Sequence, residues 1–285
     1  MSSLTLRSPA KLNLYLQVVR KRKDGYHELK TIFERISLFD RIRLTSNSTG
    51  KIKICCNHPH VPVGPKNLCY KVACLLQNHC KTSKGVTIDI QKNIPVAAGL
   101  GGGSSNAATL LMGLNRLWRL GLNRTQLVAL GKKIGSDVPF FLYDCSWALG
   151  TGRGDLIKRL NLKAKLWHIL VVPKLKLYSY KVYGGLNLRL TKKKDDVNIL
   201  RSHLKTSNII GVGRCLRNDL ESSILELSPQ LAGLKKRLKL LNTQGVMISG
   251  SGPAVFGLTS SPKLAEDLLE ILKRRHSQVF AVRTL

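Results

Sequence analysis

The segment IPVAAGLGGGSSNAATLL, residues 94–111, constrains the fold more than any other part of this sequence. Gly99 and Gly101–Gly103 give it a backbone with almost no side chains, and such a backbone loses much conformational entropy when it is ordered. An apolar run with helical spacing begins directly on the last residues of the segment. We therefore predict that the glycine stretch is the entry to a helix and not a flexible linker.

The start of a helix is a place where anions bind. The first backbone N–H groups of a helix have no partner within it, and the helix dipole adds partial positive charge there. Glycines let a phosphate approach these amides, and Ser104 and Ser105 add hydroxyl groups. The segment lacks the Lys-Ser or Lys-Thr ending of a Walker P-loop and the acidic ribose partner of a dinucleotide fingerprint. We predict a phosphate-binding loop of another kind, with a triphosphate as its guest.

The remaining sequence predicts an α+β protein. Short alternating or β-branched runs indicate a mostly antiparallel sheet in the first half; they are LTLRS, LNLYLQVV, RISLFDRIRLTS, KIKICC and GVTIDIQKNIP. Helical patterns in this half cover 67–80, 104–120 and 124–133.

From about residue 165 the pattern restarts. The predicted elements are a strand KLWHILVVP, a helix at 179–186, a polar loop at 191–198, two helices interrupted at Pro229, a strand at 245–259, a helix at 262–275 and a strand QVFAVRTL. This restart predicts two lobes, and we place an N-terminal domain at 1–160 and a C-terminal domain at 161–285.

The charge of the chain is extreme. A formal net charge of +31 and a pI near 10.3 favour polyanionic partners. The basic clusters are scattered; they lie at 20–23, 192–194, 235–237 and 273–275. Aromatic residues make up only 6% and do not alternate with basic ones, as a platform for single-stranded nucleic acid would need. We expect non-specific polyanion binding at low salt but no specific nucleic acid partner, and a nucleic-acid-binding protein is the alternative of a different class.

The cysteines number seven, with no CxxC pair, so a disulfide framework is not expected. A possible thiol and imidazole cluster has irregular spacing and falls partly on one predicted helix, so we predict no metal site; its members are Cys55, Cys56, His58, His60, Cys69, Cys74 and Cys80. No apolar run reaches 18 residues, and the N-terminus lacks the apolar core of a signal peptide. We therefore expect a cytoplasmic protein without a membrane partner.

Three motifs resemble those of the GHMP small-molecule kinases and stand in the same order. SPAKLNLYL at 8–16 resembles the first motif, and PVAAGLGGGSSNAA at 95–108 resembles the second, which binds the phosphates of ATP in that family. GVMISGSGPAVFGL at 245–258 resembles the third. The resemblance implies the two-lobed GHMP kinase fold, with ATP and the substrate bound in the cleft between the lobes. It also implies Mg²⁺ as cofactor and transfer of a phosphoryl group to an alcohol.

Two further segments narrow the resemblance within the family. RKDGYHELKTIF at 22–33 and GSDVPFF at 135–141 are similar to members whose alcohol substrate carries a cytidyl group. The alternative within the same family is a kinase for another small alcohol, such as homoserine or mevalonate. ATP and a cytidyl-bearing small molecule are the expected partners, and the chain is expected to be a monomer or a homodimer.

The resemblance implies two catalytic residues. Asp137 would be the general base for the attacking hydroxyl, and Lys11 would keep that aspartate ionised and orient the hydroxyl. The residues alone also allow Asp137 to be a helix N-cap and Lys11 to be a surface lysine. Pro139 is expected to end any local helix, which leaves Asp137 at the end of an element.

The resemblance also implies the nucleotide contacts. The ATP-binding residues would be Asn67 together with Pro95, Val96, Ala97, Ala98, Gly99, Leu100, Gly101, Gly102, Gly103, Ser104 and Ser105. Asn67 could equally cap the helix that starts beside it. The amides and serine hydroxyls of the loop would hold the β- and γ-phosphates with Mg²⁺. No protein ligand of the metal is predicted.

Four residues are candidates for binding the alcohol substrate. Tyr26 and His27 follow a DG turn, so the tyrosine ring could stack on cytosine while the imidazole pairs with its polar edge. Asn13 shares a strand face with Lys11 and could hydrogen-bond the substrate. Tyr183 is the candidate for the opposite face of the base, with Tyr178 and Tyr180 as alternatives.

Overall fold

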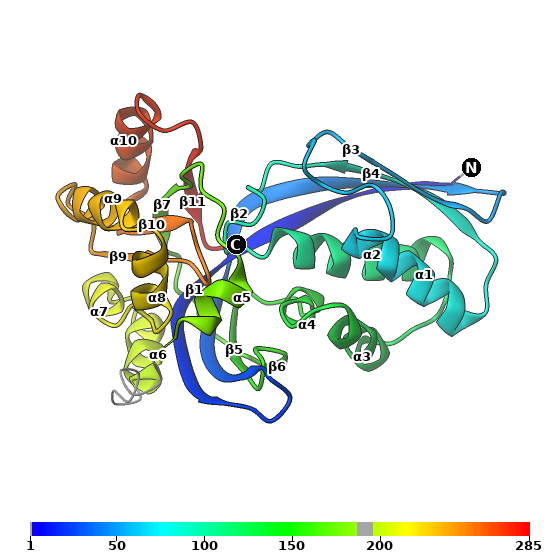
Figure 1. Ribbon diagram of the computed structural model, residues 1–285, viewed down its shortest axis with the longest axis horizontal. Coiled ribbons are helices and arrows are strands. Elements are labelled where there is room, and N and C mark those ends of the chain that lie inside the picture. The colour runs from blue at the N-terminus through cyan, green and yellow to red at the C-terminus, as the bar shows by residue number, and fades with distance from the viewer. Residues whose placement is uncertain (1, 187–195) are drawn as a thin grey trace. The chain divides into compact units, whose positions relative to one another are not determined.

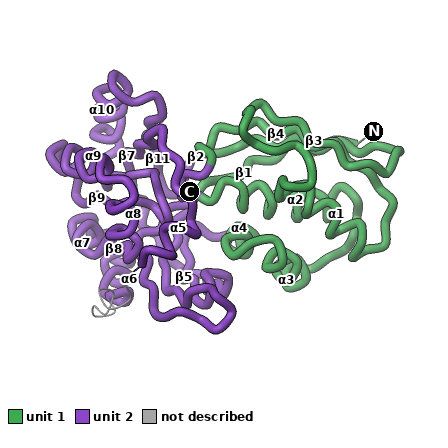
Figure 2. The backbone as a smooth tube through the Cα atoms, in the orientation of Figure 1, with its two compact units in different colours: residues 1–10, 38–96, 101–144 green, residues 11–37, 97–100, 145–285 purple. Residues whose placement is uncertain are grey.

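The computed structural model describes residues 2–186 and 196–285 and contains two compact units. Unit 1 consists of residues 1–10, 38–96 and 101–144, and unit 2 of residues 11–37, 97–100 and 145–285 (Figure 2). The units are discontinuous in sequence because the strands β1 (Ser3–Lys21) and β2 (His27–Asn47) run through both. The α+β class is confirmed, and the predicted domain boundary at residue 160 stays a prediction.

Unit 1 is a sheet covered on one face by helices. Besides parts of β1 and β2 it contains β3 (Ile52–Cys56), α1 (Leu68–Cys80), β4 (Gly85–Gln91), α2 (Gly102–Leu117), α3 (Arg124–Ile134) and α4 (Val138–Leu142). Strand β4 pairs with β2 antiparallel and with β3 parallel, because α1 makes the crossover from β3 to β4. Helices α1 and α2 run along one face of β3 and β4 (Figure 1).

The core of unit 1 lies between that sheet face and α2. Alternate residues of β2, such as Ile42 and Leu44, are buried, as are Leu110 and Leu114 of α2. The helix approaches the sheet closely at Gly113, where a Cβ atom would lie 2.6 Å from a methyl group of Leu44. Each fully buried leucine or isoleucine contributes roughly 1.5–3 kcal/mol. The helix that follows the glycine stretch is therefore held in place by the sheet.

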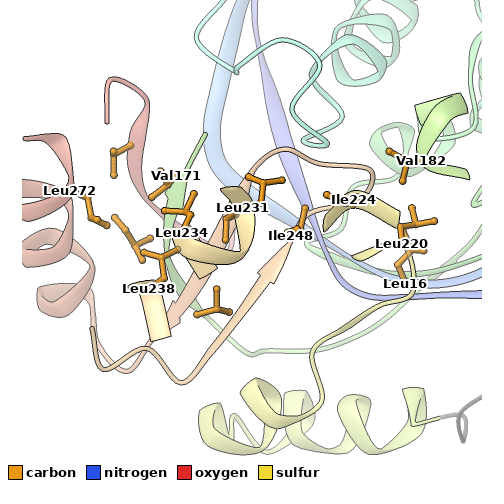
Figure 3. Packing of buried hydrophobic residues seen from close by; sticks show 14 of the residues in the cluster. Leu16, Val171, Val182, Leu220, Ile224, Leu231, Leu234, Leu238, Ile248 and Leu272 are labelled. Atoms are coloured by element: carbon orange, nitrogen blue, oxygen red, sulfur yellow. The ribbon is translucent and has the colours of Figure 1, made fainter. Parts of the chain in front are cut away.

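Unit 2 contains a second, antiparallel sheet with the strand order β11-β7-β10-β9. Its elements are β5 (Trp147–Thr151), β6 (Leu156–Arg159), β7 (Trp167–Val171), α5 (Ser179–Gly184), α6 (Val197–Lys205), α7 (Ile209–Arg214), β8 (Arg217–Asn218), α8 (Glu221–Leu227), α9 (Gln230–Lys239), β9 (Gly245–Ile248), β10 (Val255–Thr259), α10 (Pro262–Lys273) and β11 (Val279–Arg283). Figure 3 shows Leu231, Leu234 and Leu238 of α9 in the buried cluster that includes Val171 of β7.

Several predicted elements need correction. The run at 245–259 forms two strands, β9 and β10, which pair antiparallel with Ile248 opposite Val255. Gly250 (φ 55°) and Gly252 (φ 74°) adopt left-handed conformations in the turn between them. Pro139 does not end a helix but lies in the first turn of α4, where its missing N–H costs nothing.

Other differences concern short elements and ends. Helix α2 begins at Gly102, two residues before the predicted start at Ser104. The sequence patterns did not predict β5, β6, α6 or α7, which have four to nine residues each. Most of the predicted polar loop at 191–198 lies outside the described residues.

Candidate active site

The glycine loop leads into α2 as the sequence predicts. Ala97 (φ 54°), Gly99 (φ 77°) and Gly101 (φ 68°) have left-handed backbones, a conformation that most side chains disfavour. Gly101 is the N-cap of α2, and in the described chain no side chain caps this helix. The N-cap residue therefore leaves the first-turn amides without a side-chain acceptor, and phosphate binding by these amides stays a prediction.

The two serines of the loop have different environments. Ser105 is fully buried, and its hydroxyl lies 2.8 Å from the hydroxyl of Ser8. Ser104 is half-buried, and a Cβ atom on Gly135 would lie 3.9 Å from its Oγ. Within unit 1 the GSDVPFF segment thus lies beside the first turn of α2. The candidate hydroxyl for a phosphate contact is that of Ser104.

Asp137 stands at the end of an element, as expected. It is half-buried and occupies the N-cap position of α4, but its carboxylate makes no capping hydrogen bond to the described amides of that helix. The Val138 amide instead donates to the carbonyl of Gly135 at 3.2 Å. The helix-capping alternative therefore does not explain why this position carries an aspartate.

Lys11 is buried in unit 2, with 4% of its surface exposed, so the surface-lysine alternative is wrong. Its ammonium donates to Asn13 Oδ1 at 2.5 Å, and Asn13 Nδ2 donates to Thr31 Oγ1 at 2.8 Å. The Thr31 hydroxyl donates in turn to the carbonyl of Tyr15 at 2.6 Å. Removing an ammonium from water costs several kcal/mol, and these hydrogen bonds offset part of that cost and fix the position of Nζ.

Parts of all three motifs meet around Lys11 in unit 2. The Lys11 amide donates to the carbonyl of Leu100 at 3.0 Å. A Cβ atom on Gly99 would lie 2.1 Å from the Ser249 carbonyl oxygen, and one on Gly250 would lie 3.4 Å from Lys11 Nζ. The 2.1 Å approach at Gly99 and the left-handed backbones of both residues (φ 77° and 55°) explain why both positions are glycine. Three segments far apart in sequence therefore converge on one buried lysine.

The candidate base-binding residues also lie in unit 2. Tyr26 is 56% exposed, and the guanidinium of Arg153 lies 5.0 Å from its ring centroid. His27 stacks on Tyr183 with a centroid distance of 5.2 Å and an interplanar angle of 26°. Of the three candidate tyrosines, Tyr183 is thus the one in ring contact with His27. The other two, Tyr178 and Tyr180, form a ring contact with each other at 5.8 Å.

The imidazole of His27 is held in its neutral form. Partial burial, followed by the nearby charge of Lys21, lowers its pKa below the ordinary value of 6.5. A neutral imidazole has one donor and one acceptor nitrogen, which suits the polar edge of a base. Sequence reasoning did not single out Arg153 or Thr31, although Thr31 lies inside the segment at 22–33.

The comparisons with known proteins agree with this geometry. The profile of the GHMP kinases N terminal domain matches residues 67–145, and that of the GHMP kinases C terminal domain matches residues 200–278. This chain belongs to the GHMP kinase family. ATP is the phosphoryl donor that the family implies.

Two relatives of this GHMP kinase are similar over nearly its full length. A 4-diphosphocytidyl-2-C-methyl-D-erythritol kinase of Shouchella clausii is 40% identical over 281 residues, covering 99% of this chain and 94% of the relative. A protein of the same name from Bacillus cytotoxicus is 41% identical over 283 residues, covering 99% and 97%.

Solved structures support the fold. A crystal structure of 4-(cytidine 5'-diphospho)-2C-methyl-D-erythritol kinase superimposes with a TM-score of 0.85 at 32% identity, covering 99% of this chain and 100% of that one. The mevalonate kinase of L. major has a TM-score of 0.77 at 16% identity, covering 99% and 97%, and shows the shared fold alone.

Asn67 of this GHMP kinase is the N-cap of α1. Its Oδ1 accepts a hydrogen bond from the Cys69 amide at 2.8 Å, and its Nδ2 donates to the Pro62 carbonyl at 2.6 Å. The capping role is therefore confirmed. The adenine contact that the family resemblance implies stays a prediction.

Among the described residues, no group of three His, Cys, Asp or Glu side chains is placed to hold a metal ion. Burial raises the pKa of the Cys69 thiol to about 12.

A groove of about 480 Å³ on unit 1, lined by Arg41, Arg43 and Cys55 among others, includes none of the predicted site residues. In the part of the chain that the structure describes, no helix has the length and apolar character that crossing a bilayer requires.

Proposed function

We propose that this protein phosphorylates 4-diphosphocytidyl-2-C-methyl-D-erythritol. It transfers the γ-phosphoryl group of ATP to the 2-hydroxyl, giving the 2-phosphate and ADP, in the non-mevalonate route to isoprenoid precursors. The observation that carries the proposal is the convergence of three GHMP-type motifs at Lys11, whose buried ammonium is hydrogen-bonded to Asn13. The names of the relatives and the DGYHELKT segment support the choice of substrate.

Backbone amides of the glycine loop bind the phosphoryl donor, ATP. The amides of Gly101–Gly103 at the start of α2, with the hydroxyl of Ser104, bind the β- and γ-phosphates of ATP. Glycine at these positions lets the phosphates approach within hydrogen-bonding distance. Ala97, Gly99 and Gly101 have left-handed backbones in this loop, and a loop that is held in its binding shape needs little reorganisation when the nucleotide binds.

The chemical step needs a proton acceptor and a fixed charge. As the substrate oxygen bonds to the γ-phosphorus and the bond to the β-phosphate oxygen breaks, the hydroxyl proton passes to the carboxylate of Asp137. The ammonium of Lys11, held by Asn13, orients the hydroxyl. Positioning of the two reactants supplies much of the rate enhancement in such a reaction.

Mg²⁺ fits the donors in unit 1. It takes oxygen ligands and is held in kinases by few protein groups together with substrate phosphates and water. Ser104 lies beside Gly135 in the segment that also carries Asp137, so the Ser104 hydroxyl and the Asp137 carboxylate are the protein oxygens that would hold the ion. When bound, the ion neutralises charge on the phosphates.

Tyrosine and histidine rings recognise the cytidyl group. The exposed ring of Tyr26 stacks on cytosine, and the neutral imidazole of His27 pairs with its polar edge. Tyr183 contributes through its ring contact with His27. Arg153 lies over Tyr26 and limits the ring faces on which the base can stack.

A direct assay tests the proposal. Purified protein is incubated with Mg·ATP and 4-diphosphocytidyl-2-C-methyl-D-erythritol, and ADP and the 2-phosphate are measured. Parallel incubations with mevalonate and with homoserine should give no ADP above background. Turnover of either compound in place of the cytidyl substrate would assign another GHMP activity. Absence of any turnover, with nucleic acid binding that collapses between about 50 and 200 mM salt, would favour the nucleic-acid-binding alternative.

A further inference from the structure

One buried carboxylate lies beneath the glycine loop. Asp40, on the core side of β2, is fully buried in unit 1 and accepts four hydrogen bonds. Its Oδ1 accepts from the amides of Asn93 at 2.8 Å and Ile94 at 2.9 Å. Its Oδ2 accepts from Lys92 Nζ and from Asn106 Nδ2, the latter at 2.8 Å. A buried carboxylate is stable in the fold only when its lone pairs are satisfied in this way.

These donors come from both ends of the loop. Residues 92–94 follow β4 and directly precede Pro95, so they are the entry stem. Asn106 lies in α2 just after the loop, so it is the exit stem. A single side chain from a strand distant in sequence therefore holds both stems of residues 95–105.

The same network reaches the start of α2. Asn106 Nδ2 also donates to the Ser8 hydroxyl at 2.9 Å, which lies 2.8 Å from that of Ser105. The Lys92 side chain is 5% exposed, and a Cβ atom on Gly102 would lie 3.1 Å from its Nζ. The ammonium that neutralises Asp40 thus lies against the first residue of α2.

The glycine loop requires support at its two stems to stay ordered. Three left-handed residues within five positions, two of them glycines, mean that the free loop has many competing conformations. Fixing both stems reduces the entropy that the loop loses when it is ordered. A loop ordered before the ligand arrives binds more tightly, because less ordering is left to do.

We propose that Asp40 is a positioning residue that pre-forms the phosphate-binding loop through its stems. It acts on ATP binding without touching the nucleotide. This inference rests on the proposed function only in that the loop binds ATP phosphates, and the order of the loop itself can be measured without any reaction.

The test is Asp40→Asn in the full-length protein. The amide group keeps the shape but removes the charge opposite Lys92 and turns one acceptor into a donor. We expect hydrogen exchange at the amides of residues 96–105, without nucleotide, to rise at least about tenfold, equivalent to about 1.4 kcal/mol. The KM for ATP should rise by a similar factor, while the KM for the cytidyl substrate changes less than about twofold.

Glu34→Gln is the matched control. Glu34 is also fully buried, lies 2.9 Å from His168 Nε2 and accepts from Thr284 Oγ1 at 2.6 Å, all within unit 2. It should lower the melting temperature as Asp40→Asn does, but leave loop exchange and the KM for ATP within about twofold. Equal effects of the two variants on loop exchange and on the KM for ATP would overturn the proposal, because such effects would then reflect general destabilisation of the fold.

A milder variant covers the case in which Asp40→Asn does not fold. Asn106→Leu removes the exit-stem donor to Asp40, together with the hydrogen bonds of Asn106 to Ser8 and Lys92, and leaves the ion pair of Lys92 with Asp40. Loop exchange raised by about threefold or more supports the proposal, and unchanged exchange overturns it. A wild-type protein that fails to phosphorylate the cytidyl substrate would instead overturn the proposed function and leave the exchange result intact.

Discussion

Two regions of the molecule are built on opposite principles. The phosphate-loop region, residues 94–106 with the turn at 135–137, relies on bare backbone amides fixed by buried polar side chains. The base-recognition region, residues 22–28 with Arg153 and Tyr183, consists of rings and partly exposed ion pairs. Arg22, for example, pairs with Asp24 at 3.1 Å and with Glu28 at 2.8 Å, with 34% of its side chain exposed.

The difference reflects what each ligand group requires. A phosphate needs several donors at fixed positions and no side chain in the way, so the backbone there must be strained and supported. A base needs a flat apolar face and a few polar atoms, which side chains on a turn can supply. If this contrast holds, changes in the phosphate-loop region alter turnover and ATP binding, whereas changes in the base-recognition region alter only the KM for the cytidyl substrate.

The largest effect is expected from Asp137→Asn. Loss of the proton acceptor should lower kcat by about 10²–10⁴-fold. The affinity for ATP, measured by titration of the protein with nucleotide, should stay within about twofold. A variant that turns over at the wild-type rate would remove Asp137 from the mechanism.

Gly99→Ala tests the backbone requirement. A left-handed alanine costs roughly 1–2 kcal/mol, and the 2.1 Å approach to the Ser249 carbonyl adds an overpacking cost of about 1–3 kcal/mol. The matched control is Gly25→Ala in the base-recognition region, with φ +83° but no atom of the described residues within 4 Å of its Cβ position. Thermal unfolding should show a clearly larger loss at Gly99, and equal losses would mean that close approach does not matter there.

Tyr26→Ala tests the base-recognition region. Stacking of a base on an aromatic ring is worth about 1–3 kcal/mol, so the KM for the cytidyl substrate should rise about 5- to 150-fold. The KM for ATP should not change. Tyr178→Ala, which removes a tyrosine of similar exposure (54% against 56%), is the control and should change neither constant. A rise in both constants for Tyr26→Ala would break the division between the regions.

The smallest effect is a pH dependence. The pKa of His27 is lowered mainly by burial, so the folded protein takes up this proton at a lower pH than the ordinary 6.5. Affinity for the cytidyl substrate should therefore be constant above pH 6.5 and weaken as the pH falls through the lowered pKa. Steady-state KM values between pH 5 and 8 would show this, and in His27→Gln the dependence should flatten. An unaltered dependence in that variant would assign it to another group.

Much of the fold could be predicted because the signals are local. Helix α1 was expected at 67–80 and is found at Leu68–Cys80, since its cap and apolar spacing lie within one short segment. The break between α8 and α9 falls at Pro229 for the same reason. The run at 245–259 reads as one strand in the sequence, because periodicity cannot show that the chain reverses direction at the glycines in its middle.

Only part of the candidate site could be predicted from the sequence. The pattern named Ser104 and Ser105 alike, but consecutive residues on a helix point about 100° apart, so packing turned Ser105 toward Ser8. No pattern distinguished Tyr183 from its two neighbours until the chain brought it to His27. Arg153 had no signal beyond its place between two glycines.

The sequence alone determined that a bare, glycine-rich backbone leads into an apolar helix, because backbone preferences depend on each residue and its immediate neighbours. Only the tertiary structure decided what supports that backbone. The hydrogen bond from Asn106 to Asp40 joins residues 66 positions apart, and the contact of Gly99 with Ser249 joins residues 150 positions apart. Such contacts depend on how whole elements pack, and no local pattern encodes them.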